Sequence, residues 1–398
     1  MRRLLLLTSA VVLVDTLFFA ALTPLLPHYA DSLGLGKTGA GVLAAAYPAG
    51  TFVGAIPSGL VASRLGAKPT VIIGLSLVGV CTILFGVAEQ AWQLDLARFA
   101  QGCASSFSWT GALAWLVASA PPDRRGRLIG NAFAAAVVGA LFGPVIGGIA
   151  SLAGVGWTFG AVAVASFGLV AWAAATPAEP KQAPQGVRYL VDALRDPRML
   201  FGAWFVVLPA LLFGTVSVLA PLRFDALGFG SVAIGAVFLC AAAGEAVNNV
   251  QLGKLSDRHG PVVPLLGGLV ASTVLAALLP WPDNRFVLAV LVIAAAIAFG
   301  TFFTPGMTLV SNLAEERGLR FGWSFALLNI AWAPGQALGA AAGGALAHAT
   351  SDAVPYLALS AICALTLAVL WRSRASTGST TQLAPASSGS SSHITGGA

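Results

Sequence analysis

The chain alternates long apolar runs with short polar segments. A helix rises about 1.5 Å per residue, so roughly 20 apolar residues cross the ~30 Å hydrocarbon core of a bilayer. On this basis the pattern predicts twelve spanning helices, over residues 4–29, 39–62, 70–88, 92–118, 128–150, 155–176, 199–222, 231–252, 262–280, 286–312, 322–348 and 354–371. An even number of spans predicts that both termini lie on the same side of the membrane.

The start of the chain imitates a signal peptide, because two arginines precede the apolar run from Leu4 to Val14. The run continues past Asp15 to about Pro27, which is long enough to span the bilayer. We therefore expect this segment to be the first span and to remain uncleaved.

Composition supports a membrane protein. Of 398 residues, 57% are hydrophobic and 9% are charged, and the mean hydropathy of +0.86 exceeds what a soluble domain carries. The net charge of +6 does not indicate nucleic-acid binding, because the basic residues lie in short loops between apolar runs. Four cysteines and four histidines lack metal-ligand or catalytic spacing, so we expect no metal, no cofactor and no enzymatic activity.

The placement of basic residues predicts the orientation. Lysine and arginine concentrate in the termini and the even-numbered loops, whereas only Lys37, Arg223 and Arg285 lie in or beside odd-numbered loops. By the positive-inside rule, the termini and even loops are cytoplasmic. We expect a multi-pass protein of the plasma membrane that works as a monomer in contact with lipid.

The two halves of the sequence are related by an internal repeat. Gly59, Arg64 and Gly66 recur as Gly253, Arg258 and Gly260, each 194 positions later, and Gly143 and Gly147 recur 192 positions later as Gly335 and Gly339. Such a repeat predicts two similar six-helix bundles with a substrate site between them. The expected units are an amino-terminal bundle over 1–177, a cytoplasmic linker with a short surface helix over 178–198, a carboxyl-terminal bundle over 199–373 and a disordered tail over 374–398.

The fifth predicted span carries a glycine stripe. Gly139, Gly143 and Gly147 recur every fourth residue, with Pro144 and Gly148 beside them. On a helix these glycines form one face without side chains, against which a second helix can pack closely. The spacing Gly-x-x-x-Gly-Pro-x-x-Gly-Gly resembles the antiporter signature of the major facilitator superfamily, particularly of its drug:proton antiporters. A tightly packed, bent helix without any role in transport direction would carry the same stripe.

The loop after the second span also resembles this superfamily. Gly59, Ser63, Arg64 and Gly66 follow its Gly-x-x-x-Asp-Arg-x-Gly pattern, with Ser63 where the family has aspartate. The second copy consists of Gly253, Asp257, Arg258 and Gly260. The resemblance implies a latch between the halves on the cytoplasmic side. Because Ser63 replaces the aspartate, we expect a weaker latch, and we expect Ser63→Asp to favour the outward-facing state.

Arg98 lies within the fourth span, where the sequence resembles the family motif whose arginine is linked to proton transfer. An arginine inside a membrane costs at least ~2.5–3.5 kcal/mol on insertion scales, so it needs a partner or a wet cavity. Asp95 lies three residues earlier on the same helical face, which predicts a local Asp95–Arg98 pair. Two roles remain open for this pair, a part in proton transfer and a purely structural neutralisation.

Two acids fall near the middle of predicted spans. Asp15 in the first span and Glu245 in the eighth have no lysine or arginine at contact spacing on their own helix. A carboxylate at this depth must be protonated or paired, which makes both residues candidates for proton coupling. Alternatively, each is a neutral carboxyl group hydrogen-bonded to a polar side chain of the next helix.

The resemblance implies an all-α, twelve-span major facilitator fold and proton-coupled efflux of an amphiphilic or cationic organic molecule by alternating access. Its cavity would be lined by mid-depth aromatic and polar residues. The candidates are Phe18, Phe19, Ser105, Trp109, Phe213, Phe303, Asn329 and Trp332. The alternative function is proton-coupled or facilitated transport of a polar metabolite such as a sugar.

Overall fold

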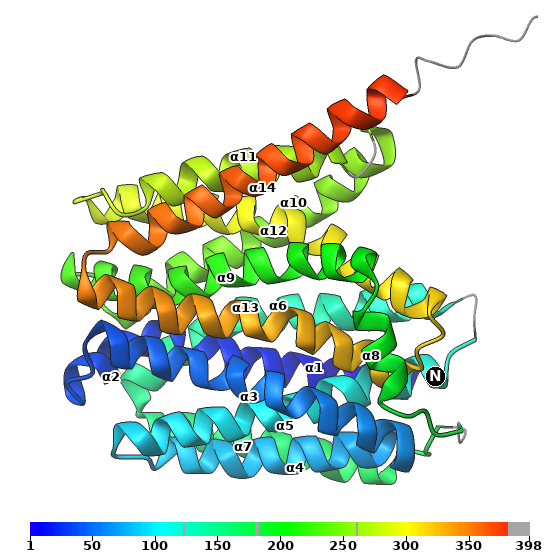
Figure 1. Ribbon diagram of the computed structural model, residues 1–398. Coiled ribbons are helices and arrows are strands. Elements are labelled where there is room, and N and C mark those ends of the chain that lie inside the picture. The colour runs from blue at the N-terminus through cyan, green and yellow to red at the C-terminus, as the bar shows by residue number, and fades with distance from the viewer. Residues whose placement is uncertain (122–123, 180–182, 260–261, 381–398) are drawn as a thin grey trace, which may run out of the picture.

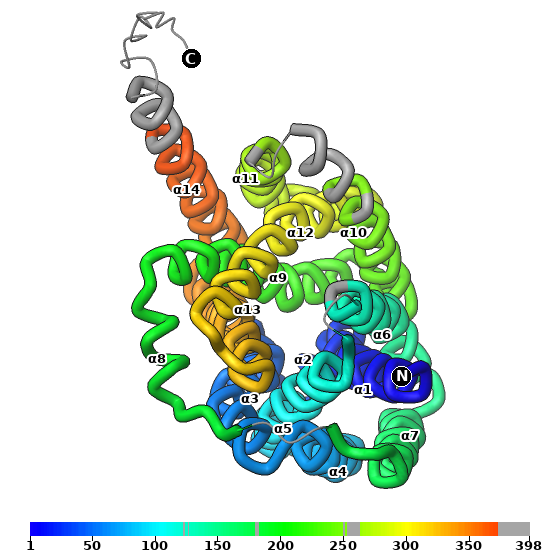
Figure 2. Tube along the Cα trace, turned by 90° about the vertical axis from the view of Figure 1, so that its right-hand side faces the viewer, coloured from blue at the N-terminus to red at the C-terminus, as the bar shows by residue number. Residues whose placement is uncertain are grey.

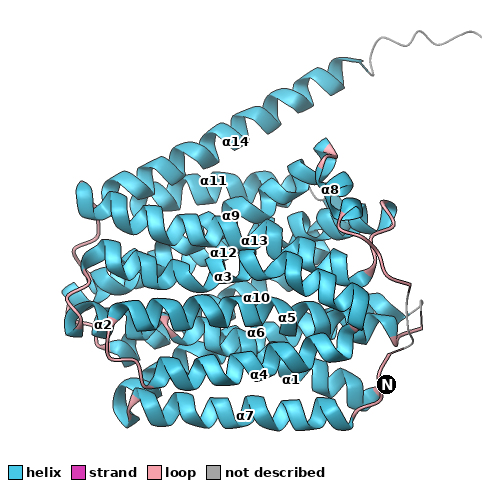
Figure 3. Cartoon of the chain, turned by 60° about the horizontal axis from the view of Figure 1, so that its bottom comes forward, coloured by secondary structure: helices cyan, strands magenta, loops and turns pink. Residues whose placement is uncertain are grey.

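The computed structural model describes residues 1–121, 124–179, 183–259 and 262–380. In this part of the chain the regular structure is entirely helical (Figure 3). The elements are α1 (Arg2–Ala21), the 3-10 turn η1 (Thr23–Leu25), α2 (Leu26–Ser32), α3 (Gly36–Leu65), α4 (Ala67–Gly86), α5 (Ala91–Ala118), α6 (Arg125–Ala153), α7 (Val155–Ala175), α8 (Arg188–Leu194), α9 (Pro197–Ala226), α10 (Ser231–His259), α11 (Val262–Leu278), α12 (Arg285–Glu316), α13 (Phe321–Ala349) and α14 (Ala353–Thr380).

Each of the twelve predicted spans corresponds to a long helix, and the short linker helix predicted between the halves is α8. The first span differs from its prediction because it is divided into α1, η1 and α2. Pro24 and Pro27 explain the division, since neither residue can donate the backbone hydrogen bond that a continuous helix needs there. Helix α14 continues beyond the predicted end at 371 to Thr380, and the rest of the predicted tail lies outside the described residues.

Within the described residues, nine helices are long and apolar enough to cross a membrane. The other three long helices are α5, α11 and α13. The apolar part of α11 is shorter, over Val263–Leu278, and α5 carries the charged residues Asp95 and Arg98. All twelve run roughly parallel or antiparallel to one another (Figure 1), so the protein is an all-α integral membrane protein.

The helices pack in two groups with the same pattern of neighbours. In the first group α1 packs on α6, α3 on α5, and α4 on both α5 and α7; in the second group α9 packs on α13, α10 on α12, and α11 on both α12 and α14. These pairs correspond one to one under the sequence repeat. Figure 2, an end view, shows the two groups side by side with α8 running along the outside between them.

The glycine stripe of α6 packs against the backbone of α1. A β-carbon added to Gly139 or Gly147 would overlap the carbonyl oxygen of Leu13 or Ala21, and one added to Gly143 would lie 2.8 Å from the carbonyl oxygen of Leu17. Only glycine permits this approach. The other signature residues face α10, because Gly148 contacts Val232 and the Pro144 carbonyl meets Gly235.

The carboxyl-terminal group repeats this contact. Gly335 and Gly339 of α13 approach the carbonyl oxygens of Val207 and Leu211 on α9. Their equivalents on α1 are Leu17 and Ala21, which are 190 positions earlier in both cases (207 − 17 and 211 − 21). The duplication therefore preserves this contact between helices as well as the glycines themselves.

The two groups meet mainly where α3 packs on α13 and α6 packs on α10. We call the end of the bundle with Met1 and α8 the linker end, and the opposite end the far end (Figure 1). At the far end Gly41 approaches Gly344, and Lys37 forms an ion pair of 2.5 Å with Asp352. At the linker end Gly59 packs on the Trp323 ring. Helices α3 and α13 are thus in contact at both ends of the bundle.

The α6–α1 contact leads to a test on one helix. Gly147→Leu should lower the free energy of unfolding by about 1–3 kcal/mol, because the new side chain displaces the α1 backbone. Gly130→Leu on the same helix is the matched control, since no atom lies within 4 Å of a β-carbon at Gly130. Thermal unfolding in detergent measures both variants, and equal unfolding temperatures would show that the stripe is not a packing surface.

Candidate functional site

Asp15 lies on α1, near the middle of the first span (Arg2–Ser32), and is only 2% exposed. Three hydroxyl groups donate to its carboxylate: Ser105 at 2.5 Å and Tyr47 at 3.2 Å to Oδ2, and Ser108 at 3.2 Å to Oδ1. Ser105 and Ser108 are three residues apart and therefore share one face of α5. Within the described residues, no lysine or arginine lies within ion-pair distance of Asp15.

This set of partners suits a carboxyl group that changes charge. A hydroxyl can donate to a carboxylate and can rotate to accept from a protonated carboxyl, so the same three groups satisfy both forms. An arginine or lysine at contact distance would hold the carboxylate permanently in its charged form. Of these three hydroxyl partners only Ser105 was predicted, as a wall residue, although the Ser105–Ser108 spacing contains the signal that also identifies Ser108. The side chain of Trp109, another predicted wall residue, also contacts the Asp15 carboxyl group. Tyr47 was missed because it lies on a different helix.

Arg98 is 1% exposed and binds the end of α1. Its guanidinium donates to the carbonyl oxygens of Phe18 and Phe19, each at 3.3 Å, and to Oε1 of Gln101 at 3.3 Å. The last four carbonyl groups of a helix lack intrahelical donors and carry its negative dipole end, so a cation there is stabilised. Arg98 therefore caps α1 just before η1 begins.

The predicted pairing of Arg98 with Asp95 is wrong. Asp95 is half-buried, and neither residue has an ion-pair partner within the part of the chain that the structure describes. The α1 carbonyl groups replace the carboxylate because Arg98 extends into the bundle, whereas Asp95 remains near its edge. Tyr47 connects Arg98 to Asp15, since its ring lies 4.7 Å from the guanidinium carbon while its hydroxyl donates to Asp15.

Glu245 occupies a different environment from Asp15. It lies on α10 against Gly300 of α12, where a β-carbon would come within 2.7 Å of the carboxylate. Its carboxylate makes no hydrogen bond or ion pair with the residues that the structure describes. One turn along the helix, Asn248 donates to Thr301 at 3.1 Å. This polar contact between α10 and α12 does not involve Glu245. The structure does not bring the two predicted acids into contact.

The predicted wall residues separate into several groups. Phe19 joins the two halves, because its ring lies 5.2 Å from Tyr47 and 5.4 Å from Trp332 of α13. Phe18 is 2% exposed and packs on Phe159 inside the first group.

The remaining wall candidates are partly buried. Trp109 contacts Phe133 of α6, Phe213 contacts Phe299, and Phe303 packs among the core residues near the linker end. Asn329 lies one turn from Trp332, and its buried Nδ2 has no hydrogen-bond partner in the described structure. Asn329 and Phe19 therefore provide a polar group and an aromatic ring beside Trp332.

The residues of the loop motif after the second predicted span lie largely on a helix. Gly59, Ser63 and Arg64 belong to the last turns of α3, and Gly66 makes the turn with φ +102°, a conformation that favours glycine. Glu179 accepts from the backbone N–H groups of Ala67 and Lys68 at the start of α4. In the second copy, Gly253 belongs to α10, whereas Gly260 and the side chains of Asp257 and Arg258 lie outside the described structure.

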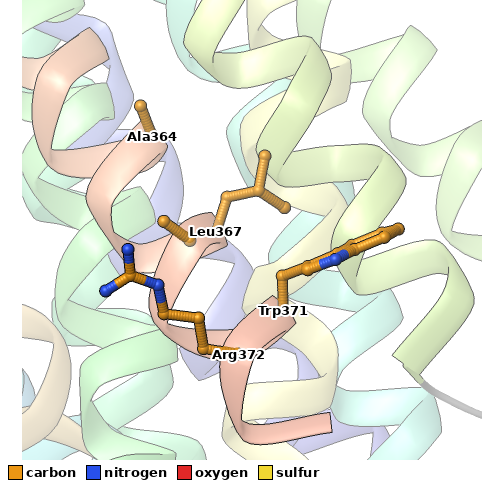
Figure 4. Close-up of a pocket in the computed structure, with 5 residues that line it drawn as sticks. Ala364, Leu367, Trp371 and Arg372 are labelled. Carbon is orange, nitrogen blue, oxygen red and sulfur yellow. The ribbon is translucent and has the colours of Figure 1, made fainter. Parts of the chain in front are cut away.

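Two hollows on the surface of the described structure lie away from these residues. One of about 370 Å³ is lined by Ala364, Leu367, Ala368, Trp371 and Arg372 of α14 (Figure 4). Another of about 330 Å³ lies at the far end, among residues that include His28, Phe85 and Glu89. Neither includes a predicted site residue, so the arrangement around Asp15 is the better candidate for function.

Comparisons with known proteins bear on the family and the fold of the chain. A family model described as the Major Facilitator Superfamily matches residues 8–335. A chloramphenicol resistance protein of Streptomyces lividans is 28% identical over 368 residues, covering 87% of this chain and 90% of that protein. The multidrug resistance protein MdtG of Escherichia fergusonii is 26% identical, covering 81% and 83%.

Solved structures show the same fold. A nucleoside transporter, NupG, matches with a TM-score of 0.71 at 16% identity, covering 93% of this chain and 99% of that one. A D-xylose-proton symporter matches with a TM-score of 0.70 at 15% identity, covering 92% and 96%. The chain belongs to the major facilitator superfamily, and it is therefore a membrane transporter of small molecules rather than an enzyme.

The position of Arg98 predicts unequal effects at two residues of α5. Arg98→Lys should lower the free energy of unfolding by about 1.5–3 kcal/mol, because a single ammonium group cannot reach both the Phe18 and the Phe19 carbonyl oxygens. Asp95→Asn is the matched control and should change it by less than about 0.5 kcal/mol. Thermal unfolding checks both variants. A large effect of Asp95→Asn would support the predicted Asp95–Arg98 pair instead.

Proposed function

We propose that this transporter exports an amphiphilic or cationic organic molecule in exchange for protons, by alternating access. The observation that carries the proposal is Asp15, a buried carboxyl group held by three hydroxyl groups at mid-depth in α1. The similar proteins named for chloramphenicol and multidrug resistance support export of this class of substrate.

The carboxyl group supplies the coupling. A charged Asp15 attracts a cationic substrate, and a protonated Asp15 does not, so proton binding on one side of the membrane releases the substrate there. This difference in affinity between two states is what coupled exchange requires. Glu245 either shares the transported proton or shapes the pocket of the carboxyl-terminal half.

The aromatic residues beside Asp15 supply the binding surface for such a molecule. Phe19 and Tyr47 lie against each other, and Phe19 contacts Trp332 of the opposite half. A flat organic cation is attracted to aromatic faces and requires few directional hydrogen bonds. The unpartnered Nδ2 of Asn329 provides one polar contact. Because these residues come from both halves, movement of one half against the other would reshape the site.

The moving units in this proposal are the bundles 1–177 and 199–373, joined by the linker 178–198. The remaining segment, 374–398, is cytoplasmic, and its first residues, up to Thr380, continue α14. The concentration of basic residues in the even-numbered loops supports a cytoplasmic linker end and two cytoplasmic termini. We place the protein in the plasma membrane as a monomer. The likeness to sugar and nucleoside transporters is below 25% identity and concerns the fold alone, so it does not favour the alternative of polar-metabolite transport.

Neutral variants of the two acids test the coupling. In proteoliposomes with an acidic lumen, the wild-type protein should accumulate ethidium, an aromatic cation, and an uncoupler should abolish this. Asp15→Asn should reduce pH-driven accumulation at least tenfold and remove the pH dependence of ethidium binding. Glu245→Gln should do the same if it shares the proton, or change the range of substrates if it only shapes the pocket.

Asp192→Asn on α8 and Glu89→Gln at the far end are matched controls, because both side chains are exposed. Uphill, uncoupler-sensitive accumulation in both acid variants would show that protons travel elsewhere. Accumulation of D-xylose, with neither ethidium nor chloramphenicol transported, would replace the proposal by the polar-metabolite alternative.

A further inference from the structure

Gln185, in the linker between the halves, binds both halves at the linker end. It is 8% exposed, although it belongs to a segment without regular structure between α7 and α8. In the amino-terminal half it contacts Ser63 at the end of α3. In the carboxyl-terminal half it contacts the turn between α12 and α13 and the first turn of α13. A linker that only tethered two bundles would not need such contacts.

On the amino-terminal side the bonds use the main chain of Gln185. Its N–H donates to the Ser63 hydroxyl at 2.8 Å, and the same hydroxyl donates to the Gln185 carbonyl oxygen at 2.9 Å. Ser63 therefore makes a reciprocal pair of hydrogen bonds with one linker residue. An aspartate at this position could accept from the N–H but could not donate to the carbonyl oxygen.

On the carboxyl-terminal side both the side chain and the main chain take part. Nε2 of Gln185 donates to the Gly318 carbonyl oxygen at 3.0 Å, and Oε1 accepts from the backbone N–H of Arg320 at 2.8 Å. These partners fix the orientation of the amide, because a carbonyl can only accept and a backbone N–H can only donate. The indole N–H of Trp323 donates to the Gln185 carbonyl oxygen at 2.9 Å.

The parts that Gln185 joins are themselves firmly placed. Trp323 is fully buried, and its ring packs on Gly59 of α3. The turn before α13 is held on its other side by Arg317, which pairs with Asp196 at 2.5 Å. Asp196 also caps α9 by accepting from the Arg198 N–H, and this bond together with Arg317 lowers the pKa of its carboxyl group. Gln185 thus connects rigid parts of both halves.

We propose that Gln185 is a positioning residue that holds the linker end closed, through what we call the linker clasp: Gln185 with Ser63, Gly318, Arg320 and Trp323. Opening this end to the cytoplasm requires α3 and α13 to separate there. Gln185 cannot follow both helices, so its bonds to at least one half must break in each transport cycle. The clasp therefore favours states closed to the cytoplasm, whichever substrate the protein carries.

Two substitutions separate the two sides of the clasp. Gln185→Met keeps the length of the side chain and the main-chain bonds to Ser63 and Trp323, but removes the bonds to Gly318 and Arg320. Ser63→Ala removes only the bonds to Ser63. The matched control is Gly186→Ala, because no atom lies within 4 Å of a β-carbon at the neighbouring Gly186.

The measurement is a pair of distance distributions by electron-spin resonance, on the full chain in lipid nanodiscs with the four native cysteines replaced. One label pair, Leu65→Cys with Glu315→Cys, reports the linker end. The other pair, Ser32→Cys with Ser351→Cys, reports the far end. All four label sites are exposed.

The double variant Gln185→Met with Ser63→Ala should raise the ratio of open to closed linker ends about tenfold, equivalent to about 1.4 kcal/mol. Each single variant should give a smaller rise, and the distance at the far end should stay unchanged. Ser63→Asp should also open the linker end, because an aspartate cannot donate to the Gln185 carbonyl oxygen. This outcome is opposite to the expectation from the family pattern of the loop, in which Ser63→Asp closes this end.

Three results would overturn the proposal. The first is that distances in the double variant equal those of Gly186→Ala. The second is a broadening of the distances at both ends, which indicates loss of structure, and the third is closure of the linker end by Ser63→Asp. The distances are measured without substrate. Failure of the linker clasp is therefore distinguishable from failure of the proposed proton-coupled export, which is measured by ethidium accumulation.

Discussion

Two helices in a membrane approach closely only where neither places a side chain between them. Lipid provides no hydrophobic drive for helix association, so van der Waals contact between backbones must supply it. Glycines make this possible at α6 against α1 and at α13 against α9. The position of α1 follows from this contact, because Gly139, Gly143 and Gly147 meet its backbone on both sides of Asp15.

Once α1 is held in this way, the buried polar groups find partners on neighbouring helices. Arg98 reaches the carbonyl groups at the end of α1, and Asp15 reaches hydroxyl groups on α3 and α5. Breaking either set leaves a polar group without water or protein to bind, which is costly in a membrane interior. The packing contact and the polar site are therefore interdependent, and a change at the glycine stripe should also disturb Asp15.

The two halves resemble each other in packing but differ in chemistry. The α1–α6 contact recurs as α9–α13 with the same residue offsets, whereas the surroundings of Asp15 have no counterpart around Glu245. Duplication accounts for the shared framework. In the exchange that we propose, this asymmetry would let one half carry the coupling group while the other half provides binding surface.

The sequence by itself determined the elements of the fold. Hydrophobic run length predicted all twelve long helices, and the repeat of Gly143 and Gly147 as Gly335 and Gly339 predicted two similar six-helix bundles. It also identified Asp15, Glu245 and Arg98, because a charged residue within an apolar run is visible without a structure. Partners from other segments were not visible in the sequence. Asp95 was chosen as the partner of Arg98 by spacing along one helix, whereas its actual partners are carbonyl groups of α1. Tyr47, which binds Asp15, and Gln185, which binds Ser63, also come from distant segments. Only the tertiary structure decided those contacts, since periodicity records which residues share a helix face but not which helix that face meets.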